Sequence, residues 1–237
     1  MKTGNGRSQG RGWPLTNDAA SPLRDAGRPS FVKGWRILIA GTGGQGALTA
    51  ARLLCECFAE RGHEVVSGQL HGMAQRGGAV QSSVIIDGGI CPIIPSGRAD
   101  FVVGLEPIET VRALPLMSSQ TTVYMNTTPV MPFVLAQRAV REEGGKEYPE
   151  VAELASYVRA VTKNLFTLDA TRRAAEAGSS AALNMVMLGC LLGSAGLPCT
   201  ADAFSDFVAA RIPPALRDAN VSAFRMGIEA VNGGGGG

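Results

Sequence analysis

Two short loops combine residue types at a spacing that could do chemistry. The first is HGMAQRGG, His71 to Gly78, which places an imidazole, an amide, a guanidinium and paired glycines close together. The guanidinium of Arg76 can bind a carboxylate or phosphate through two parallel hydrogen bonds. The imidazole of His71 can donate or exchange a proton near neutral pH. The residue types leave a plainer interpretation equally open: a polar loop in which Arg76 is solvated and His71 bonds to nearby backbone.

The second loop is GTGGQG, Gly41 to Gly46, which directly follows a short apolar run. It has the G-x-G-x-x-G spacing. Gly41 permits a tight turn, Gly43 lets the backbone approach a ligand, and Gly46 lets the next helix pack closely on the strand. The N–H groups at the start of that helix would then face an anion. Taken alone, the motif establishes only that a strand turns sharply into a helix.

A dinucleotide site would require one further residue, an acid at the end of the second strand to bind the ribose. Glu64 stands at the start of that strand, and its end carries Ser67, Gln69 and His71. The missing acid argues against a free-standing reductase that binds NAD or a flavin, which is kept as an alternative.

The elements that must position these loops follow from hydrophobic periodicity. They predict an α/β fold: an open, mostly parallel, Rossmann-like sheet with helices on both faces and a helical C-terminal third. The strand–glycine loop–helix–strand unit predicts that the first two strands are parallel, with a right-handed crossover between them. Strands are expected over residues 36–40, 64–70, 79–86, 101–105, 121–126 and 164–169, and helices over 47–61, from 107, and over 151–161, 170–177, 180–194, 200–211 and 215–231.

In an open α/β sheet, ligands gather at the carboxyl ends of the strands. Glu106 ends a buried strand there, so it is expected either to pair with Arg76 or to cap the next helix. Asn184 interrupts an apolar helix and would need hydrogen-bond partners, which favours a packing or interface role.

Composition and charge narrow the function further. Residues 1–34 carry six of the 22 basic and two of the 20 acidic residues, so the remainder of the chain is slightly acidic. A nucleic-acid-binding protein usually has a basic stripe on its folded surface, and none is expected here. The five cysteines include no CxxC, which favours buried thiols over a metal site.

The two ends of the chain differ in composition from the part between them. We expect a disordered arm over residues 1–34, a single domain over 35–232 and a flexible glycine tail over 233–237. The N-terminal segment has no apolar stretch of signal-peptide type, and the longest apolar run is too short for a membrane span. The expected location is the cytoplasm, without membrane contact.

Several motifs together resemble one family. A strand running into GTGGQG, then HGMAQRGG about 30 residues on, then a strand ending in GLEP (Gly104 to Pro107), is similar to the gamma domain of 2-oxoacid:ferredoxin oxidoreductases, closest to the indolepyruvate type. The later AALNMVMLG, Ala181 to Gly189, also resembles that family, and the similarity spans about residues 35–230. This chain departs from the family pattern at Gln69, where Glu is common, and at Ala79, where Ser is common.

The resemblance implies a small subunit that supports oxidative decarboxylation of a 2-oxo acid, such as an aryl pyruvate, to an acyl-coenzyme A. It implies that thiamine diphosphate, magnesium and iron–sulfur clusters lie on a large partner subunit, that coenzyme A is a co-substrate, and that electrons pass to ferredoxin. His71 and Arg76 are the catalytic candidates. A non-catalytic scaffold subunit is a further alternative. Substrate or cofactor contacts are expected from Gly41, Gly43, Gly44, Gln45, Gly46, Gln75, Arg76, Gly77, Gly78 and Glu106.

Overall fold

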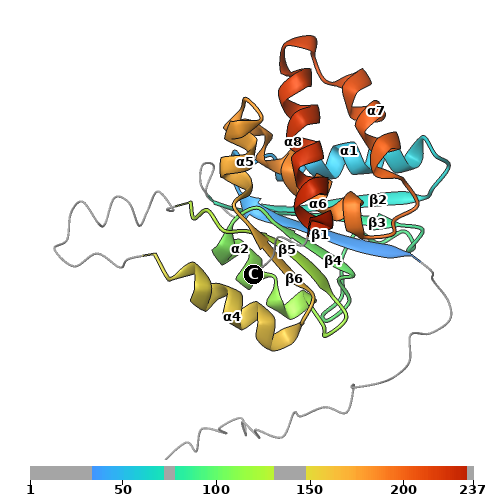
Figure 1. The fold of residues 1–237 in the computed structure, drawn as a ribbon. Coiled ribbons are helices and arrows are strands. Elements are labelled where there is room, and N and C mark those ends of the chain that lie inside the picture. Colours follow the sequence, from blue (N-terminus) through green and yellow to red (C-terminus); the bar gives the residue numbers. More distant parts are fainter. Residues whose placement is uncertain (1–33, 72–77, 131–147, 234–237) are drawn as a thin grey trace, which may run out of the picture. The chain divides into compact units, whose positions relative to one another are not determined.

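A twisted six-stranded sheet lies between two layers of helices (Figure 1). The structure is a computed structural model that describes residues 34–71, 78–130 and 148–233, without the side chain of His71. The arm predicted for residues 1–34 and the tail predicted for 233–237 therefore lie almost wholly outside the described residues. The strands are β1 (Trp35–Thr42), β2 (Val65–His71), β3 (Ala79–Ile86), β4 (Phe101–Gly104), β5 (Thr122–Asn126) and β6 (Leu165–Leu168).

The sheet order is β2-β3-β1-β4-β5-β6, with β2 and β6 at its edges. The pairs β1–β4, β4–β5 and β5–β6 are parallel, which confirms the mostly parallel sheet. The first two strands do point the same way, but they are not neighbours. β3 lies between β1 and β2 and is antiparallel to both, so β2 and β3 form a hairpin at one side of the sheet.

One face of the sheet is covered by α1 (Ala47–Ala59), α5 (Ala170–Glu176), α6 (Leu183–Ser194), α7 (Ala201–Arg211) and α8 (Pro214–Asn232). The opposite face is covered by α2 (Pro107–Arg112) and α4 (Val151–Val161). Short 3-10 turns occur at Leu114–Leu116 and Ser180–Ala182. The predicted helices on both faces and the helical C-terminal third are thus confirmed.

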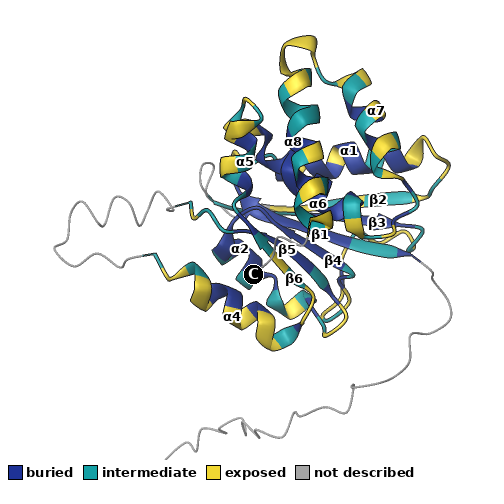
Figure 2. Cartoon of the chain, in the orientation of Figure 1, coloured by how far each residue is buried: buried dark blue, intermediate teal, exposed yellow. Residues whose placement is uncertain are grey.

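The burial pattern explains why the central helix is apolar on all sides. Every residue of α6 from Leu183 to Leu192 is buried (Figure 2). A surface helix needs only one apolar stripe, whereas α6 packs against the sheet on one side and against α8 on the other. Its glycines allow this close packing, because a Cβ atom on Gly189 would overlap the carbonyl oxygen of Phe224 in α8. None of the described helices is long and apolar enough to cross a membrane.

Candidate functional site

The carboxyl ends of the parallel strands meet at one edge of the sheet, where the glycine loop lies and where the described ends of the second loop, His71 and Gly78, are found. β1 ends at Thr42 in the glycine loop, and β2 ends at His71, where the second loop starts. β4 and β5 end beside Glu106 and Asn126, respectively. We call this the carboxyl edge. It is the position at which open α/β sheets bind their ligands.

The glycine loop turns through backbone conformations that only glycine adopts easily. Gly44 has φ +99° and Gly46 has φ +78°. The first turn of α1 follows, and no side chain caps it. Gly43 and Gly44 are exposed. The start of a 13-residue helix therefore presents backbone N–H groups at the carboxyl edge, where an anion would be stabilised.

The side chain of Gln45 holds this loop in place. Its Oε1 accepts hydrogen bonds from the backbone N–H of Thr42 at 2.8 Å and from the Thr42 hydroxyl at 3.1 Å, and its Nε2 donates to the Leu105 carbonyl at 3.0 Å. Both ends of the amide are thus occupied within the protein. Gln45 was predicted to contact substrate or cofactor; its geometry makes it a brace between the ends of β1 and β4.

Asn126 reaches the same carbonyl from the other side, and the sequence analysis did not single it out. It is fully buried. Its Nδ2 donates to the Leu105 carbonyl at 3.0 Å, and its Oδ1 accepts from the backbone N–H of Ala170 at 3.0 Å. The Leu105 carbonyl therefore accepts hydrogen bonds from both Gln45 and Asn126. Together with the bond from Ala170 to Asn126, these link the ends of β1, β4 and β5 to the start of α5. A signal was available, since an asparagine that ends a strand at the carboxyl edge is placed to bond neighbouring strand ends.

The two candidate loops are in direct contact. The N–H of Gly43 donates to the carbonyl of Gly78 at 3.0 Å. The structure thus brings the last residue of HGMAQRGG against the glycine loop, a contact that the sequence analysis did not predict. The predicted site residues Gln75, Arg76 and Gly77 lie outside the described residues, as does the side chain of His71.

Glu106 caps α2, which is one of the two roles expected for it. Its Oε2 accepts from the N–H of Glu109 at 2.9 Å. Its Oε1 accepts a hydrogen bond from the hydroxyl of Tyr148 and one from the N–H of Val130 at 3.4 Å. Burial raises the pKa of the Tyr148 hydroxyl, and its hydrogen bond to Glu106 raises it further. Tyr148 therefore remains a neutral donor that holds Glu106 at the carboxyl edge.

Asn184 has a partner that links α6 to the glycine loop. Its Nδ2 donates to the carbonyl of Gly46 at 3.2 Å. A Cβ on Gly46 would lie 2.6 Å from that same nitrogen. Gly46 is therefore favoured both by its positive φ and by the close approach of Asn184.

Asp169 and Thr128 add polar groups at the carboxyl edge that sequence reasoning also missed. The Thr128 hydroxyl donates to Asp169 Oδ1 at 2.8 Å, and the N–H of Arg172 donates to the same oxygen at 2.8 Å. Burial opposes ionisation of Asp169, but these hydrogen bonds and the nearby Arg172 and Arg173 outweigh it and lower the pKa of the carboxyl. Asp169 is thus an anion that caps α5.

Glu109 is a buried carboxylate whose raised pKa can be tested. It is 4% exposed, its Oε1 pairs with Arg112 at 2.9 Å, and its Oε2 has no hydrogen-bond partner among the described residues. Burial raises its pKa above the ordinary value of 4.5; Arg112 opposes this shift and Glu106 adds to it. The folded state therefore binds the proton more tightly than the unfolded state does.

By linkage, a carboxyl with a raised pKa destabilises the folded state as the pH rises from its unfolded pKa through its folded pKa. Glu109→Gln removes that titration. We expect the free energy of unfolding of the native protein to fall relative to the variant as the pH rises above 4.5. Urea denaturation of both proteins at several pH values measures the difference, and a difference independent of pH would contradict the assignment.

The described residues contain no group of three or more His, Cys, Asp or Glu side chains that could hold a metal ion. They offer no set of thiolates for an iron–sulfur cluster either, because all five cysteines are free and dispersed along the chain. No carboxylate stands at the carboxyl end of β2 to bind a ribose, since Glu64 precedes the other end of that strand.

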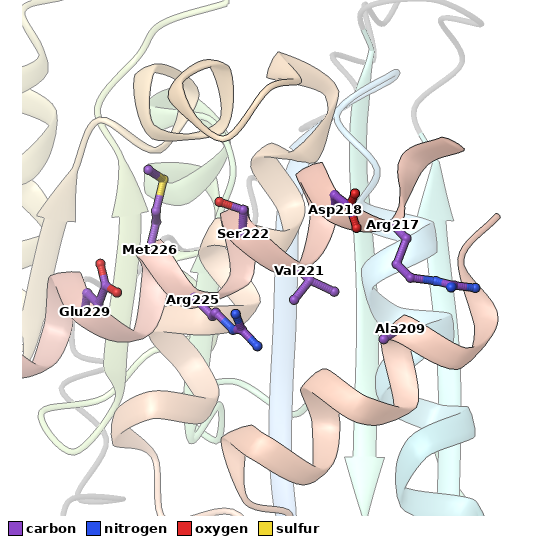
Figure 3. A pocket seen from close by; sticks show the side chains of 8 residues that line it. All are labelled: Ala209, Arg217, Asp218, Val221, Ser222, Arg225, Met226 and Glu229. Atoms are coloured by element: carbon purple, nitrogen blue, oxygen red, sulfur yellow. The ribbon is translucent and has the colours of Figure 1, made fainter. Parts of the chain in front are cut away.

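A surface cavity of about 530 Å³ opens between α7 and α8 (Figure 3). Its lining includes two cations, Arg217 and Arg225, and two carboxylates, Asp218 and Glu229. None of its lining residues belongs to the carboxyl edge. The candidate site at the carboxyl edge is therefore separate from this cavity.

The chain is similar to known proteins in both sequence and fold. Residues 36–230 match the family model described as pyruvate ferredoxin/flavodoxin oxidoreductase. The chain is similar to indolepyruvate oxidoreductase subunit IorB of Archaeoglobus fulgidus, with 33% identity over 83% of this chain and 96% of that protein. It is also similar to the IorB subunit of Methanothermobacter thermautotrophicus, with 34% identity over 83% and 97% of the two chains.

Among solved structures, the fold is similar to that of the gamma subunit of a keto/oxoacid ferredoxin oxidoreductase from Geobacter sulfurreducens. The TM-score is 0.60, with 22% identity, over 84% of this chain and 99% of that chain. The sequence match runs through both candidate loops and the whole sheet. The chain therefore belongs to the pyruvate ferredoxin/flavodoxin oxidoreductase family.

Proposed function

We propose that this chain is the small subunit of an indolepyruvate-type 2-oxoacid:ferredoxin oxidoreductase and acts together with a larger subunit. The observation that carries the proposal is the similarity to IorB subunits over almost their whole length. The local geometry supports it, because the glycine loop and the HGMAQRGG loop meet at the carboxyl edge through Gly43 and Gly78. That edge would form one wall of the shared active site.

The cofactors belong, in this proposal, to the larger subunit. The described residues do not fit a metal or an iron–sulfur cluster, so no step of the chemistry is assigned to a group bound here. Thiamine diphosphate with magnesium and the clusters are placed on the partner, with coenzyme A as a co-substrate and ferredoxin as the electron acceptor. The complex is proposed to be cytoplasmic, without nucleic-acid or membrane partners.

The contribution of this chain is to bind and orient an anionic group. Arg76 is the proposed contact to the substrate carboxylate or to a phosphate of coenzyme A. The uncapped N-terminus of α1 adds backbone N–H groups to the same anion, and Gln45 holds those groups in position. His71 is proposed to orient the loop or to exchange a proton.

We also infer that residues 35–232 act as a single domain. The family match over residues 36–230 supports this boundary.

The first experiment is to tag the full chain, purify it from its native cells under anoxic conditions and identify what accompanies it. A large subunit that carries thiamine diphosphate and iron–sulfur clusters, with activity on aryl 2-oxo acids, supports the proposal. A well-folded chain that is isolated alone with a bound dinucleotide would instead support the reductase alternative.

The Arg76→Ala variant tests the anion contact within the assembled complex. We expect kcat/KM for the 2-oxo acid or for coenzyme A to fall at least about tenfold, because the variant loses the charged contact to the anion. A tenfold fall corresponds to a loss of about 1.4 kcal/mol of transition-state binding. Steady-state kinetics with each substrate varied in turn identifies which anion is bound.

The matched control is Arg52→Ala, which removes an exposed arginine of α1 that pairs with Glu56. It should leave turnover unchanged. If Arg76→Ala also leaves turnover unchanged in a complex of normal composition, the subunit is a scaffold and the anion-binding role is wrong.

A further inference from the structure

Two buried cysteines from distant parts of the chain lie side by side. Cys57 is in the last turn of α1, and Cys199 lies just before the start of α7. Their Sγ atoms are 3.5 Å apart although 142 residues separate them in sequence. Cys57 is fully buried and Cys199 is 6% exposed. No disulfide joins the two sulfurs, and no other pair of cysteines is found in contact among the described residues.

The surroundings of this pair favour a thiolate. Arg61 Nη1 lies 2.9 Å from the Cys57 sulfur and 2.8 Å from its carbonyl oxygen, while Nη2 donates to the carbonyl of Ala203 at 2.9 Å. A guanidinium therefore joins the end of α1 to the first turn of α7 directly beside the two sulfurs. His63 lies nearby and bonds Asp87 at 2.8 Å.

The two thiols are not equivalent. The hydrogen bond from Cys57 lowers the pKa of Cys199 to about 7; burial opposes this shift, and Arg61 and His63 support it. The same hydrogen bond and burial raise the pKa of Cys57. Cys199 is also the less buried of the two. Its sulfur is therefore the one that a small oxidant reaches first, and it acts as the nucleophile.

We propose that Cys57 and Cys199 form a peroxide-reactive dithiol that closes to an intramolecular disulfide and locks α1 to α7. The proposal rests on this geometry and does not depend on the proposed function. A thiolate with a second cysteine beside it is the arrangement in which a sulfenic acid is captured as a disulfide.

The chemistry balances with hydrogen peroxide as the oxidant. The Cys199 thiolate attacks one peroxide oxygen, the O–O bond breaks, and Cys199 becomes a sulfenic acid while hydroxide leaves. The Cys57 sulfur then attacks the Cys199 sulfur, the S–O bond breaks, and the Cys57 proton joins the departing hydroxide to give water. The proton that Cys199 lost on ionising neutralises the hydroxide of the first step. In total, two thiols and one peroxide give one disulfide and two waters. The sulfurs must approach from 3.5 Å to a bond length of about 2.05 Å.

The other cysteines provide internal controls. Cys55 lies two residues before Cys57 on the same helix but faces elsewhere, and its thiol bonds to Ser67. Cys190 is buried in α6 and donates to the carbonyl of Gly227 at 3.4 Å. Cys91 is exposed and has no sulfur beside it among the described residues. Among the described cysteines, only Cys57 and Cys199 are close enough for both thiols to be consumed in one disulfide.

The test treats the reduced full chain with one equivalent of hydrogen peroxide, quenches it with an alkylating reagent in denaturant and measures the intact mass. The untreated protein should carry five labels and the treated protein three, and a non-reducing digest should contain one linked pair of peptides with Cys57 and Cys199. The oxidised protein should unfold at a temperature roughly 5 °C or more higher, and dithiothreitol should reverse the shift.

Variants make the test specific to the pair. Cys55→Ser should still lose two labels on oxidation, whereas Cys57→Ser and Cys199→Ser, checked for native circular dichroism, should form no internal disulfide and show no rise in melting temperature. Either single variant suffices if the other does not fold. Retention of all five labels, a disulfide through another cysteine, or irreversible oxidation of Cys199 without a link to Cys57 would overturn the proposal.

Discussion

Replacing Gly189 by alanine should lower the free energy of unfolding by about 3 kcal/mol, the upper range for a residue forced into a packed core. A Cβ atom at this position of α6 would overlap the carbonyl oxygen of Phe224 and would lie 3.0 Å from the Cα of Gly227 in α8. Both obstacles are backbone atoms of a helix, so no side chain can rotate away. The two helices would have to separate along the most extensive helix contact in the protein.

The matched control is Gly193→Ala, one turn further along the same helix. Its Cβ would meet Ile228 and Val231 at 3.2–3.3 Å, a contact that a small shift relieves. Both substitutions raise helix propensity by a similar amount, about 1 kcal/mol, so the comparison isolates the packing effect. Chemical denaturation of both variants measures it. Equal stability of the two variants would show that α6 and α8 are not packed as described.

The arrangement of strands shows where the sequence was sufficient and where it was not. The hydrophobic runs located every strand to within a few residues, because each alternates or is buried in a way that only a sheet satisfies. The pairing of β3 between β1 and β2 was missed. Pairing depends on contacts between strands far apart in sequence. The short link from His71 to Ala79 did contain the information, since parallel neighbours need a longer crossover and a short link favours an antiparallel hairpin.

The candidate site, like the sheet, was predicted from the sequence only in part. The motif spacing identified both loops, and the fold explains why they meet, since both follow strands that end at the carboxyl edge. The roles of individual side chains depended on which carbonyl each one reaches. Gln45 bonds to Leu105 and Glu106 caps α2, and these partners are set by the register of β1 on β4 and by the turn after β4. Local sequence does not specify such long-range distances.

The Asn126→Asp substitution should destabilise the protein at neutral pH by about 3–5 kcal/mol, the cost of a buried charge without a partner. Asn126 is fully buried and donates through Nδ2 to the Leu105 carbonyl and, at 3.2 Å, to the Thr171 hydroxyl. The new carboxylate could still accept from Ala170 through one oxygen. Its other oxygen would face the Leu105 carbonyl, which is also an acceptor, and the two would repel.

The pH dependence distinguishes this effect from simple loss of packing. Burial should raise the pKa of the new carboxyl above its unfolded value of about 3.9, so the folded state binds the proton more tightly. The penalty should therefore shrink as the pH falls through the raised pKa, because the protonated carboxyl can donate to Leu105 as the amide does. Asn126→Ala removes the same hydrogen bonds without adding a charge, and its cost should be independent of pH. Urea denaturation of both variants between about pH 5 and pH 8 measures the two profiles. Parallel profiles would mean that Asn126 is not the donor that joins β4, β5 and α5, and that the carboxyl edge is held together in some other way.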